Sequence, residues 1–487
     1  MSTFAKILEK RKMKNKIIGR VKEMNRLADV VSSNKAELVA IYGRRRVGKT
    51  FLVKEFFNNR FDFYATGIFE GKKSDQLLAF YDAMSHRAVR KADVPRTWME
   101  AFMQLRNHLS GLKKDRLIVF LDELPWFDTR TSQFLKAFEW FWNSWGSTEP
   151  RLKLIVCGSA TTWMTDKFIS GKGGLYNRTT ERIHLSPFTL HESSLLLKSN
   201  GLDWDASLVL EAYMVFGGVP LYLNMLKREM SLDANIDRLF FAKDAPLKDE
   251  YEFLFRSLFK ESDYYKSLID AISTRNQGIS RQEIARIAHV NENGTLTQAL
   301  KNLVSCDFIR KYSGYGKRQR DCLYQLTDLS TLFHKRFIEH YTGMDEHRWS
   351  SLIDHPTRRA WTGIAFEQVC LLHVQQIKHA LGVSGVQTDV CTWRYAGGEH
   401  TSGAQIDLLI VRRDKTINLC EMKYAALPFE ITGKYSKELR ERREIFRSVT
   451  GTSYALHLTM VSPHGVKRNA NAYVADQVIT IQDLFMD

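Results

Sequence analysis

The stretch LVAIYGRRRVGKTFLVKEFF (38–57) places an apolar run, a glycine-containing turn and a helix-like segment in direct succession. Its central residues match the pattern G-x-x-x-x-G-K-[ST], and they lie between a strand and a helix, as a phosphate-binding loop must. Backbone N–H groups from Gly43 to Lys49 and the positive end of the helix favour a bound anion. We therefore expect ATP here, with Gly43 and Gly48 shaping the loop, Lys49 contacting the β- and γ-phosphates, and Thr50 holding Mg²⁺.

Short apolar runs surround this loop, separated by longer helical patterns; they span residues 38–42, 61–65, 116–121 and 153–158. Near-continuous apolar strands that alternate with helices are typical of a buried parallel sheet. The sequence therefore predicts an α/β fold whose first domain is a P-loop core with a parallel sheet.

Polar residues follow two of the predicted strands. Asp122 and Glu123 end the run at 116–121, and Ser159 ends the run at 153–158. Ligands of α/β sheets bind at the carboxyl ends of strands, so we expect Asp122 to hold Mg²⁺ through water and Glu123 to deprotonate the attacking water. The alternative for the acidic pair is a helix N-cap. Ser159 fits a polar sensor of the γ-phosphate or an ordinary strand-end serine.

Three further segments carry a family resemblance. IIGRVKEMNRL (17–27) precedes the loop, DELPWF (122–127) contains the acidic pair, and GGVP (217–220) follows the predicted sheet. Together they resemble the ordered elements of AAA+ and STAND-type ATPases, in particular the archaeal-type prokaryotic ATPase family. The resemblance covers the chain from about residue 16 through a predicted winged helix.

The resemblance implies roles for residues outside the loop. Gly19, Arg20 and Pro220 would lie around the adenine of ATP, and Arg178 or Arg182 would supply an arginine finger. Arg182 is equally placed to pair with a local acid. ATP and Mg²⁺ are the cofactors that this resemblance implies.

Length and charge bound the remaining possibilities. At 487 residues and 56.5 kDa the chain exceeds one ordinary core, and its 44 % hydrophobic and 26 % charged residues exclude a disordered or fibrous protein. Lys and Arg number 71 against 55 Asp and Glu, and the net charge of +16 favours a polyanionic partner such as nucleic acid. The scattered cysteines form no zinc or disulfide pattern, and no apolar run is long enough for a membrane span. We expect a cytoplasmic protein without a membrane partner.

The pattern changes several times along the chain, which predicts a multidomain protein. We expect a basic N-terminal segment (1–15), the P-loop ATPase core (16–187), a helical lid (188–263), a winged helix (264–329), a connector (330–355) and a second α/β domain (356–487).

The winged helix is predicted from helices followed by two strands around GYGKRQR (314–320). Lys317, Arg318 and Arg320 lie in this hairpin and are suited to phosphate contacts on DNA. The predicted recognition helix at 295–305 offers few outward polar groups, namely Gln298, Lys301 and Asn302. Contact with DNA and docking of the module on the nucleotide as a switch both stay open.

Two acids and a lysine mark the last domain. QIDLLIV (405–411) and INLCEMK (417–423) flank a turn centred near Asp414, which places Asp407 opposite Glu421 in a hairpin. Glu421 and Lys423 share a strand face because they are two residues apart. Carboxylates suit Mg²⁺, and a lysine can orient an attacking water. Charges of this kind are also common on a solvated strand face.

This arrangement resembles the PD-(D/E)xK nuclease superfamily, whose domain is restriction-endonuclease-like. The resemblance implies a magnesium site at Asp407 and Glu421, with Glu367 on a preceding helix as a third carboxylate and Lys423 as a catalytic group. No proline precedes Asp407, where the motif often has one. The other interpretation is a degenerate fold that only binds its partner. Basic residues that could follow a phosphate backbone come next, namely Lys434, Lys437, Arg440, Arg443 and Arg447.

The sequence thus favours an ATP-gated, Mg²⁺-dependent nuclease that acts on DNA rather than RNA. Its catalytic residues would be Lys49, Glu123 and Arg178 in one site and Asp407, Glu421 and Lys423 in the other. The alternative is a STAND-like ATPase switch whose last domain binds nucleic acid or protein without cleavage. The sequence leaves open whether the protein forms a homo-oligomer. A peripheral membrane protein is disfavoured because the sequence has no amphipathic anchor.

Overall fold

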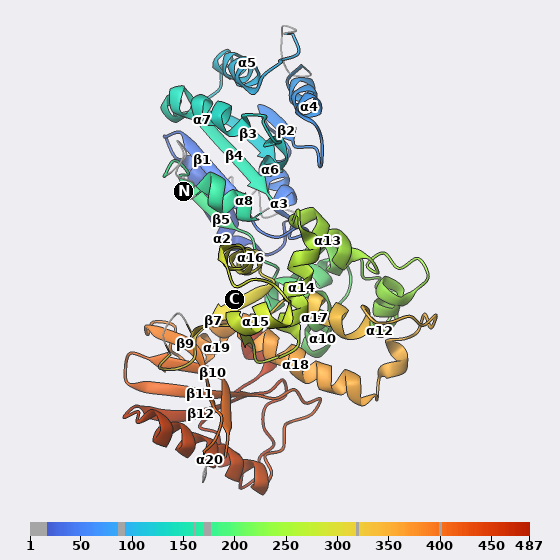
Figure 1. The fold of residues 1–487 in the computed structure, drawn as a ribbon, viewed down its shortest axis with the longest axis vertical. Helices are drawn as coiled ribbons and strands as arrows, with labels where there is room; N and C mark the ends of the chain where they lie inside the picture. The colour runs from blue at the N-terminus through green and yellow to red at the C-terminus, as the bar shows by residue number, and fades with distance from the viewer. Residues whose placement is uncertain (1–16, 86–92, 160, 170–176, 318–320, 399–401) are drawn as a thin grey trace. The chain divides into compact units, whose positions relative to one another are not determined.

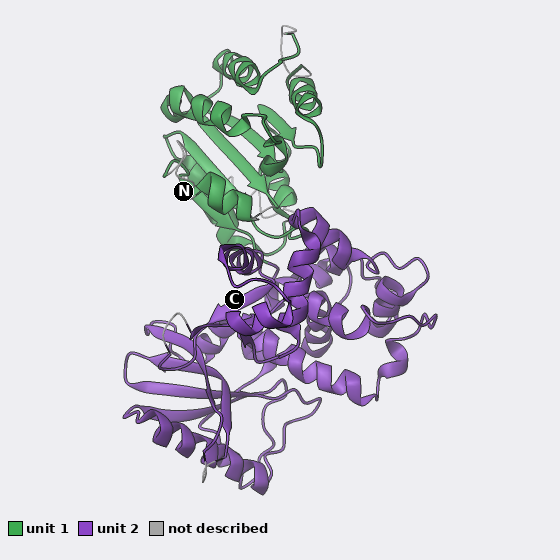
Figure 2. Ribbon diagram, viewed as in Figure 1, with its two compact units in different colours: residues 1–186 green, residues 187–487 purple. Residues whose placement is uncertain are grey.

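The computed structural model describes residues 17–85, 93–159, 161–169, 177–317, 321–398 and 402–487. The chain divides into two compact units, Met1–Ser186 and Pro187–Asp487 (Figure 2). Within the described ranges, no helix has both the length and the apolar character needed to cross a membrane.

The first unit is built on a parallel sheet (Figure 1). Its strand order is β2-β3-β4-β1-β5, and every neighbouring pair is parallel, which confirms the predicted α/β fold with a parallel sheet. The strands are β1 (Glu37–Tyr42), β2 (Phe63–Thr66), β3 (Leu117–Asp122), β4 (Leu152–Gly158) and β5 (Glu181–His184). Strand β5 was not among the predicted apolar runs.

Both faces of this sheet are covered. Val39 and Ile41 of β1 pack in one core with Leu52 of helix α3 (Lys49–Phe56), which follows the P-loop. Leu38 and Ala40 point the opposite way, as alternation along a strand requires, into an aromatic-rich core. Helices that contribute to these cores include α2 (Val21–Ser32), α3, α4 (Lys73–Ser85), α5 (Trp98–Ser110), α6 (Leu124–Phe127) and α7 (Phe134–Ser144).

The second unit begins with helices. The segment predicted as a lid contains α9 (Leu190–Ser199), α10 (Ala206–Phe216), α11 (Pro220–Leu223), α12 (Leu232–Ile236) and α13 (Glu250–Leu258). The segment predicted as a winged helix contains α14 (Ser262–Ser273), α15 (Arg281–Ile287) and α16 (Gly294–Ser305) with strands β6 (Ile279–Ser280), β7 (Ile309–Tyr312) and β8 (Leu323–Leu326). Its antiparallel sheet has the order β6-β8-β7. Helix α17 (Leu329–Phe337) follows.

The last domain contains a mixed sheet in the order β13-β12-β11-β10-β9. Its strands are β9 (Thr388–Tyr395), β10 (Ala404–Arg412), β11 (Thr416–Met422), β12 (Ala455–Val461) and β13 (Gln477–Ile479). Leu409 and Leu419 pack against Leu439 and Phe446 of α20 (Gly433–Thr450). Sequence analysis found only β10 and β11 of these strands.

One turn in the second unit depends on glycine. Gly217 and Gly218 both have positive φ angles, 65° and 66°, after the end of α10. A Cβ atom on Gly218 would lie 2.3 Å from the carbonyl oxygen of Phe188, whereas one on Gly217 would have its nearest contact at 3.5 Å. Gly218 also accepts a hydrogen bond from the Phe188 N–H, at 2.8 Å. The turn therefore leaves no room for a side chain at its second glycine.

We expect Gly218→Ala to lower the free energy of unfolding far more than Gly217→Ala does. Both changes place alanine in the left-handed region, which costs about 1–2 kcal/mol. Gly218→Ala adds a collision with backbone, for a total of roughly 3 kcal/mol or more. Urea denaturation of the two variants isolates the collision because their φ angles match. Equal losses in both variants would contradict the prediction.

The last domain begins with two helices, α18 (Pro356–Leu372) and α19 (Val374–Ala380). They separate at His373, whose φ is −109° and ψ 30°. The ring of His373 is 1 % exposed; Nδ1 lies 2.8 Å from the Val369 carbonyl oxygen, and Nε2 accepts a hydrogen bond from the Leu190 N–H at 3.0 Å. Because Nε2 accepts a hydrogen bond, the ring is neutral at the junction of the two helices.

This buried histidine makes the second unit sensitive to acid. Burial lowers the pKa of His373 to about 4, from 6.5. Because the unfolded chain takes up the proton first, stability is lost as pH falls from 6.5 towards 4, and the loss across that window is about 3 kcal/mol. His373→Gln should remove this part of the pH dependence. Urea midpoints of both proteins between pH 7 and pH 5 provide the test, and parallel pH profiles would contradict it.

Candidate functional site

The glycine-rich loop joins β1 to α3, as the sequence predicts. Gly43 has φ 148° and Gly48 has φ 91°. Gly43 also packs tightly, since a Cβ there would lie 2.2 Å from the Leu185 carbonyl oxygen. The Lys49 ammonium donates to the carbonyl oxygens of Gly43 and Arg44 at 3.0 and 2.8 Å. The Lys49 side chain thus folds back over the loop that precedes it. Its ammonium is within reach of a phosphate bound in that loop.

Asp122 lies beside the start of α3. The Thr50 hydroxyl donates to its carboxylate at 2.8 and 3.1 Å, so the two predicted Mg²⁺ residues are adjacent. The Cys157 thiol donates to the same carboxylate at 2.6 Å, and burial followed by Asp122 raises the pKa of this thiol well above its usual range. A protonated Cys157 therefore holds Asp122 in place. A hydroxyl beside a carboxylate is a donor set that suits Mg²⁺.

Glu123 follows Asp122 in a left-handed backbone conformation, with φ 47° and ψ 49°. Its carboxylate accepts hydrogen bonds from the Ser159 hydroxyl at 2.7 Å and the Ser159 N–H at 3.0 Å. The structure thus pairs the predicted base with the predicted sensor. The roles of both residues in hydrolysis stay predictions.

Arg20 links the segment before the loop to the loop itself. Its guanidinium donates to the carbonyl oxygens of Val47 at 3.2 Å and Ser186 at 2.7 Å, and its side chain is 6 % exposed. Gly19 precedes it with φ 65°. This buried arginine thus stabilises the loop through hydrogen bonds to backbone carbonyl oxygens. The contact of Gly19 and Arg20 with adenine stays a prediction.

The candidate arginine fingers lie near β5. Arg178 is exposed, whereas Arg182 donates to the Thr179 hydroxyl at 2.9 Å. Among its described contacts, the Arg182 guanidinium has no acidic partner; the neighbouring Glu181 pairs with Arg26 and accepts a hydrogen bond from the Arg182 backbone N–H at 3.1 Å. Pro220 begins α11 in the second unit. The finger and the adenine contact of Pro220 stay predictions.

In the last domain, β10 and β11 form the antiparallel hairpin predicted around Asp414. Leu408 pairs with Cys420, and Asp407 and Glu421 each lie one residue beyond this last pair of the register. Lys423 lies 3.0 Å from the Glu421 carboxylate, and its side chain is 37 % exposed. The structure thus brings Glu421 and Lys423 into direct contact, and both residues lie near enough to Asp407 to affect its pKa.

Glu421 has two further partners that sequence analysis missed. The Arg442 guanidinium lies 2.5 Å from one carboxylate oxygen, and the Tyr435 hydroxyl donates to the other at 2.7 Å. Burial raises the pKa of Glu421, but Lys423 and Arg442 outweigh it, so the pKa is lowered overall. Tyr435 and Arg442 are seven residues apart on α20, which puts them on one helix face. That spacing was the only signal in the sequence.

Glu367 on α18 interacts electrostatically with Asp407, Glu421 and Lys423. Burial, followed by Asp407, raises the pKa of Glu367 to about 7, with Lys423 acting in the opposite direction and Glu421 in the same direction. Burial also raises the pKa of Asp407, against its hydrogen bond with Gln405. A bound cation reduces the repulsion between neighbouring carboxylates of this kind. Within the described residues, however, no three His, Cys, Asp or Glu side chains are already arranged around a metal position.

The loop after β7 contains Lys317, one of the predicted nucleic-acid residues. Lys317 is exposed, whereas Arg318 and Arg320 lie outside the described residues. The base of this loop contacts the last domain: Gly314 forms a β-bridge with Thr392 of β9, and the Tyr315 ring lies 5.2 Å from the Phe446 ring. Intramolecular contact thus occurs with the sheet of the last domain.

One predicted outward residue of the recognition helix is buried. Asn302 of α16 is 7 % exposed; its amide donates to the Tyr265 hydroxyl and accepts from Gln298 at 2.9 Å. The prediction that Asn302 faces outward is wrong, because its amide satisfies the tyrosine hydroxyl between two packed helices.

Comparisons with known proteins bear on the first domain. Residues 17–226 match the sequence profile of a family described as an ATPase domain predominantly from Archaea. The chain is 25 % identical over 435 residues to the uncharacterized protein MJECL04 of Methanocaldococcus jannaschii, covering 88 % of this chain and 92 % of that protein. It is 46 % identical over 43 residues to the uncharacterized ATP-binding protein MJ0423 of the same organism, covering 9 % of this chain and 73 % of that one.

Among solved structures, the Walker-type ATPase PABY2304 of Pyrococcus abyssi is similar with a TM-score of 0.46 and 18 % identity. The match covers 65 % of this chain and 96 % of that one. The family match coincides with the loop, the acidic pair and the parallel sheet described above. Residues 17–226 are therefore similar to the ATPase domains of this predominantly archaeal family.

Proposed function

We propose that this protein is an ATP-hydrolysing, ATP-gated and Mg²⁺-dependent DNA nuclease. The observation that carries the nuclease half is the contact of Glu421 with Lys423 in one hairpin, with Asp407 and Glu367 near enough to interact with both. The ATPase half rests on Lys49, Thr50, Asp122 and Glu123 in the archaeal-type ATPase domain.

In the nucleotide site, each residue has a distinct task. Lys49 neutralises phosphate charge, Thr50 and Asp122 hold Mg²⁺, and Glu123 takes the proton from the attacking water. Ser159 holds Glu123 until water and nucleotide are both present, since its hydroxyl and N–H now occupy that carboxylate. Arg178 or Arg182 supplies positive charge to the transferred phosphoryl group.

In the carboxylate site, Asp407 and Glu421 would hold Mg²⁺, with Glu367 as the third acid. The bound ion supplies Lewis-acid stabilisation of a phosphodiester and a more acidic water. Lys423 orients the attacking water and stabilises developing negative charge. Arg442 and Tyr435 keep the Glu421 carboxylate ionised and fixed in direction.

The choice of DNA rests on charge. The chain carries +16, and α20 next to the carboxylate site presents exposed basic side chains at Lys434, Lys437, Arg440 and Arg447. Lys317 adds an exposed cation in the predicted winged helix. Clusters of this kind attract a phosphate backbone without reading its sequence.

A second candidate function is a STAND-like ATPase switch whose last domain binds nucleic acid or protein without cleavage. The observation that favours it is the occupied state of Glu421, whose two carboxylate oxygens already accept from Arg442 and from Tyr435 and Lys423. A metal ion must compete with these donors. In the switch, no metal ion displaces these donors, and the residues around Glu421 have a structural role.

A divalent-metal cleavage assay separates the two candidates. Plasmid, linear duplex and single-stranded DNA are incubated with the purified full chain and Mg²⁺ or Mn²⁺, with ATP, with a non-hydrolysable analogue or without nucleotide. If the protein is a nuclease, cleavage requires the metal and its rate changes with ATP. Glu123→Gln then separates DNA cleavage from ATP turnover. Absence of cleavage of every DNA, while ATP is hydrolysed, supports the switch.

A further inference from the structure

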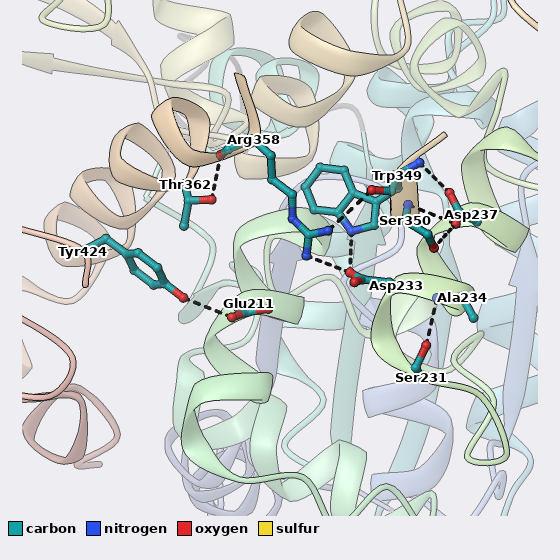
Figure 3. A network of polar contacts seen from close by, with 10 residues as sticks. All are labelled: Glu211, Ser231, Asp233, Ala234, Asp237, Trp349, Ser350, Arg358, Thr362 and Tyr424. Atoms are coloured by element: carbon teal, nitrogen blue, oxygen red, sulfur yellow. Dashed lines mark hydrogen bonds and ion pairs between the residues drawn. The ribbon is translucent and has the colours of Figure 1, made fainter. Parts of the chain in front are cut away.

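Helix α18 carries Glu367 and is contacted along its length by the segments that follow the ATPase core. Its first turn contributes Arg358, which donates to Asp233 of α12 at 2.8 Å and lies 4.1 Å from the centre of the Trp349 ring. The Trp349 indole donates to the same Asp233 carboxylate at 2.7 Å. Figure 3 shows Arg358 and Trp349 converging on Asp233.

A second contact lies next to the carboxylate site itself. Tyr424 directly follows Lys423, and its hydroxyl donates to Glu211 of α10 at 3.0 Å (Figure 3). The ring of Tyr424 lies 5.8 Å from the ring of Phe366, the neighbour of Glu367. Tyr424 therefore contacts α10 through its hydroxyl and α18 through its ring.

The third contact is at the end of α18, where His373 accepts from the Leu190 N–H of α9 and packs 5.4 Å from the Tyr213 ring of α10. The lid helices thus contact α18 near its start and the residue that ends it, and α10 reaches Phe366, beside Glu367, through Tyr424. Helix α10 runs directly into the Gly217–Pro220 turn, the segment expected to contact adenine.

From these contacts we propose that Tyr424 is a positioning residue that couples lid helix α10 to the carboxylate site, so that nucleotide state reaches Glu421, Lys423 and Glu367 through the Tyr424–Glu211 hydrogen bond. This inference rests on the proposed function. A movement of α10 displaces the Tyr424 hydroxyl, and Tyr424 is joined to Lys423 by one peptide bond. Its ring transmits the same displacement to α18 beside Glu367.

The test uses Tyr424→Phe in the full chain. This change keeps the ring against Phe366 and removes only the hydroxyl that reaches Glu211. Glu211→Gln is the conservative partner, since its amide oxygen still accepts from the tyrosine. Tyr473→Phe is the matched control, because Tyr473 is 89 % exposed in the same domain.

Two readouts are compared with and without a non-hydrolysable ATP analogue: Mg²⁺-dependent DNA cleavage, and hydrogen–deuterium exchange of residues 416–424. In wild type, nucleotide changes both. Tyr424→Phe should reduce the nucleotide effect on cleavage about tenfold, as loss of one coupling hydrogen bond implies, and abolish the effect on exchange. ATP turnover should stay within about twofold, and Glu211→Gln and Tyr473→Phe should behave like wild type.

The outcomes separate this inference from the proposed function. If wild type cleaves no DNA but Tyr424→Phe still abolishes the nucleotide-dependent exchange, the nuclease proposal fails and the coupling holds. If Tyr424→Phe retains the wild-type nucleotide effect on exchange, the coupling is overturned, whatever the cleavage result. The coupling is equally overturned if nucleotide leaves exchange at 416–424 unchanged in wild type.

Discussion

Lys49→Ala is expected to reduce ATP turnover by about 10²–10³-fold, because it removes the one ammonium that the P-loop aims at the β- and γ-phosphates. In the structure this group is held by the carbonyl oxygens of Gly43 and Arg44, inside the loop that receives the nucleotide. Steady-state phosphate release measures the loss.

The matched control is Lys54→Ala, which removes a lysine from the same helix. Lys54 lies 4.5 Å from the centre of the Tyr64 ring in the last turn of α3, away from the loop. Its loss should leave turnover within about twofold of wild type. Equal turnover in Lys49→Ala and wild type would show that hydrolysis does not depend on this loop.

Glu421→Gln is expected to reduce Mg²⁺-dependent DNA cleavage by about 10³-fold and to leave ATP turnover unchanged. The substitution keeps the side chain's shape and an acceptor for Tyr435, but it removes the charge that a cation requires. Asp407→Asn should have the same effect from the opposite strand. Cleavage and phosphate release are measured on the same samples.

Glu430→Gln is the control for the carboxylate change. Glu430 precedes α20 in the same domain and pairs with Lys467 at 3.1 Å on the surface, where both side chains are more than half exposed. This variant should cleave like wild type. Full cleavage by Glu421→Gln would remove the hairpin from the catalytic account and favour the switch.

Local sequence signals predicted the parts of the molecule that are encoded by short-range patterns. The apolar runs gave four strands of the first sheet, and the turn near Asp414 set the register of the hairpin that carries Asp407 and Glu421. Strand β5 was missed because ERIH is short and carries charges, so it lacks the apolar run of a buried strand.

Contacts between distant segments could not be predicted in this way. Cys157 reaches Asp122 because β3 and β4 are neighbours, which apolar runs alone do not reveal. Arg442 reaches Glu421 only because α20 packs on the sheet, and Tyr424 reaches Glu211 from 213 residues away. The sequence was enough to identify the candidate residues, but the fold determines which residues they contact.

We infer that this one chain contains two separate magnesium sites. Electron paramagnetic resonance of Mn²⁺, titrated into the full chain, measures this directly. We predict one bound ion without nucleotide and a second when a non-hydrolysable ATP analogue is added, with Glu421→Gln losing only the first. A single ion that appears only with nucleotide, unaffected by Glu421→Gln, would contradict the account.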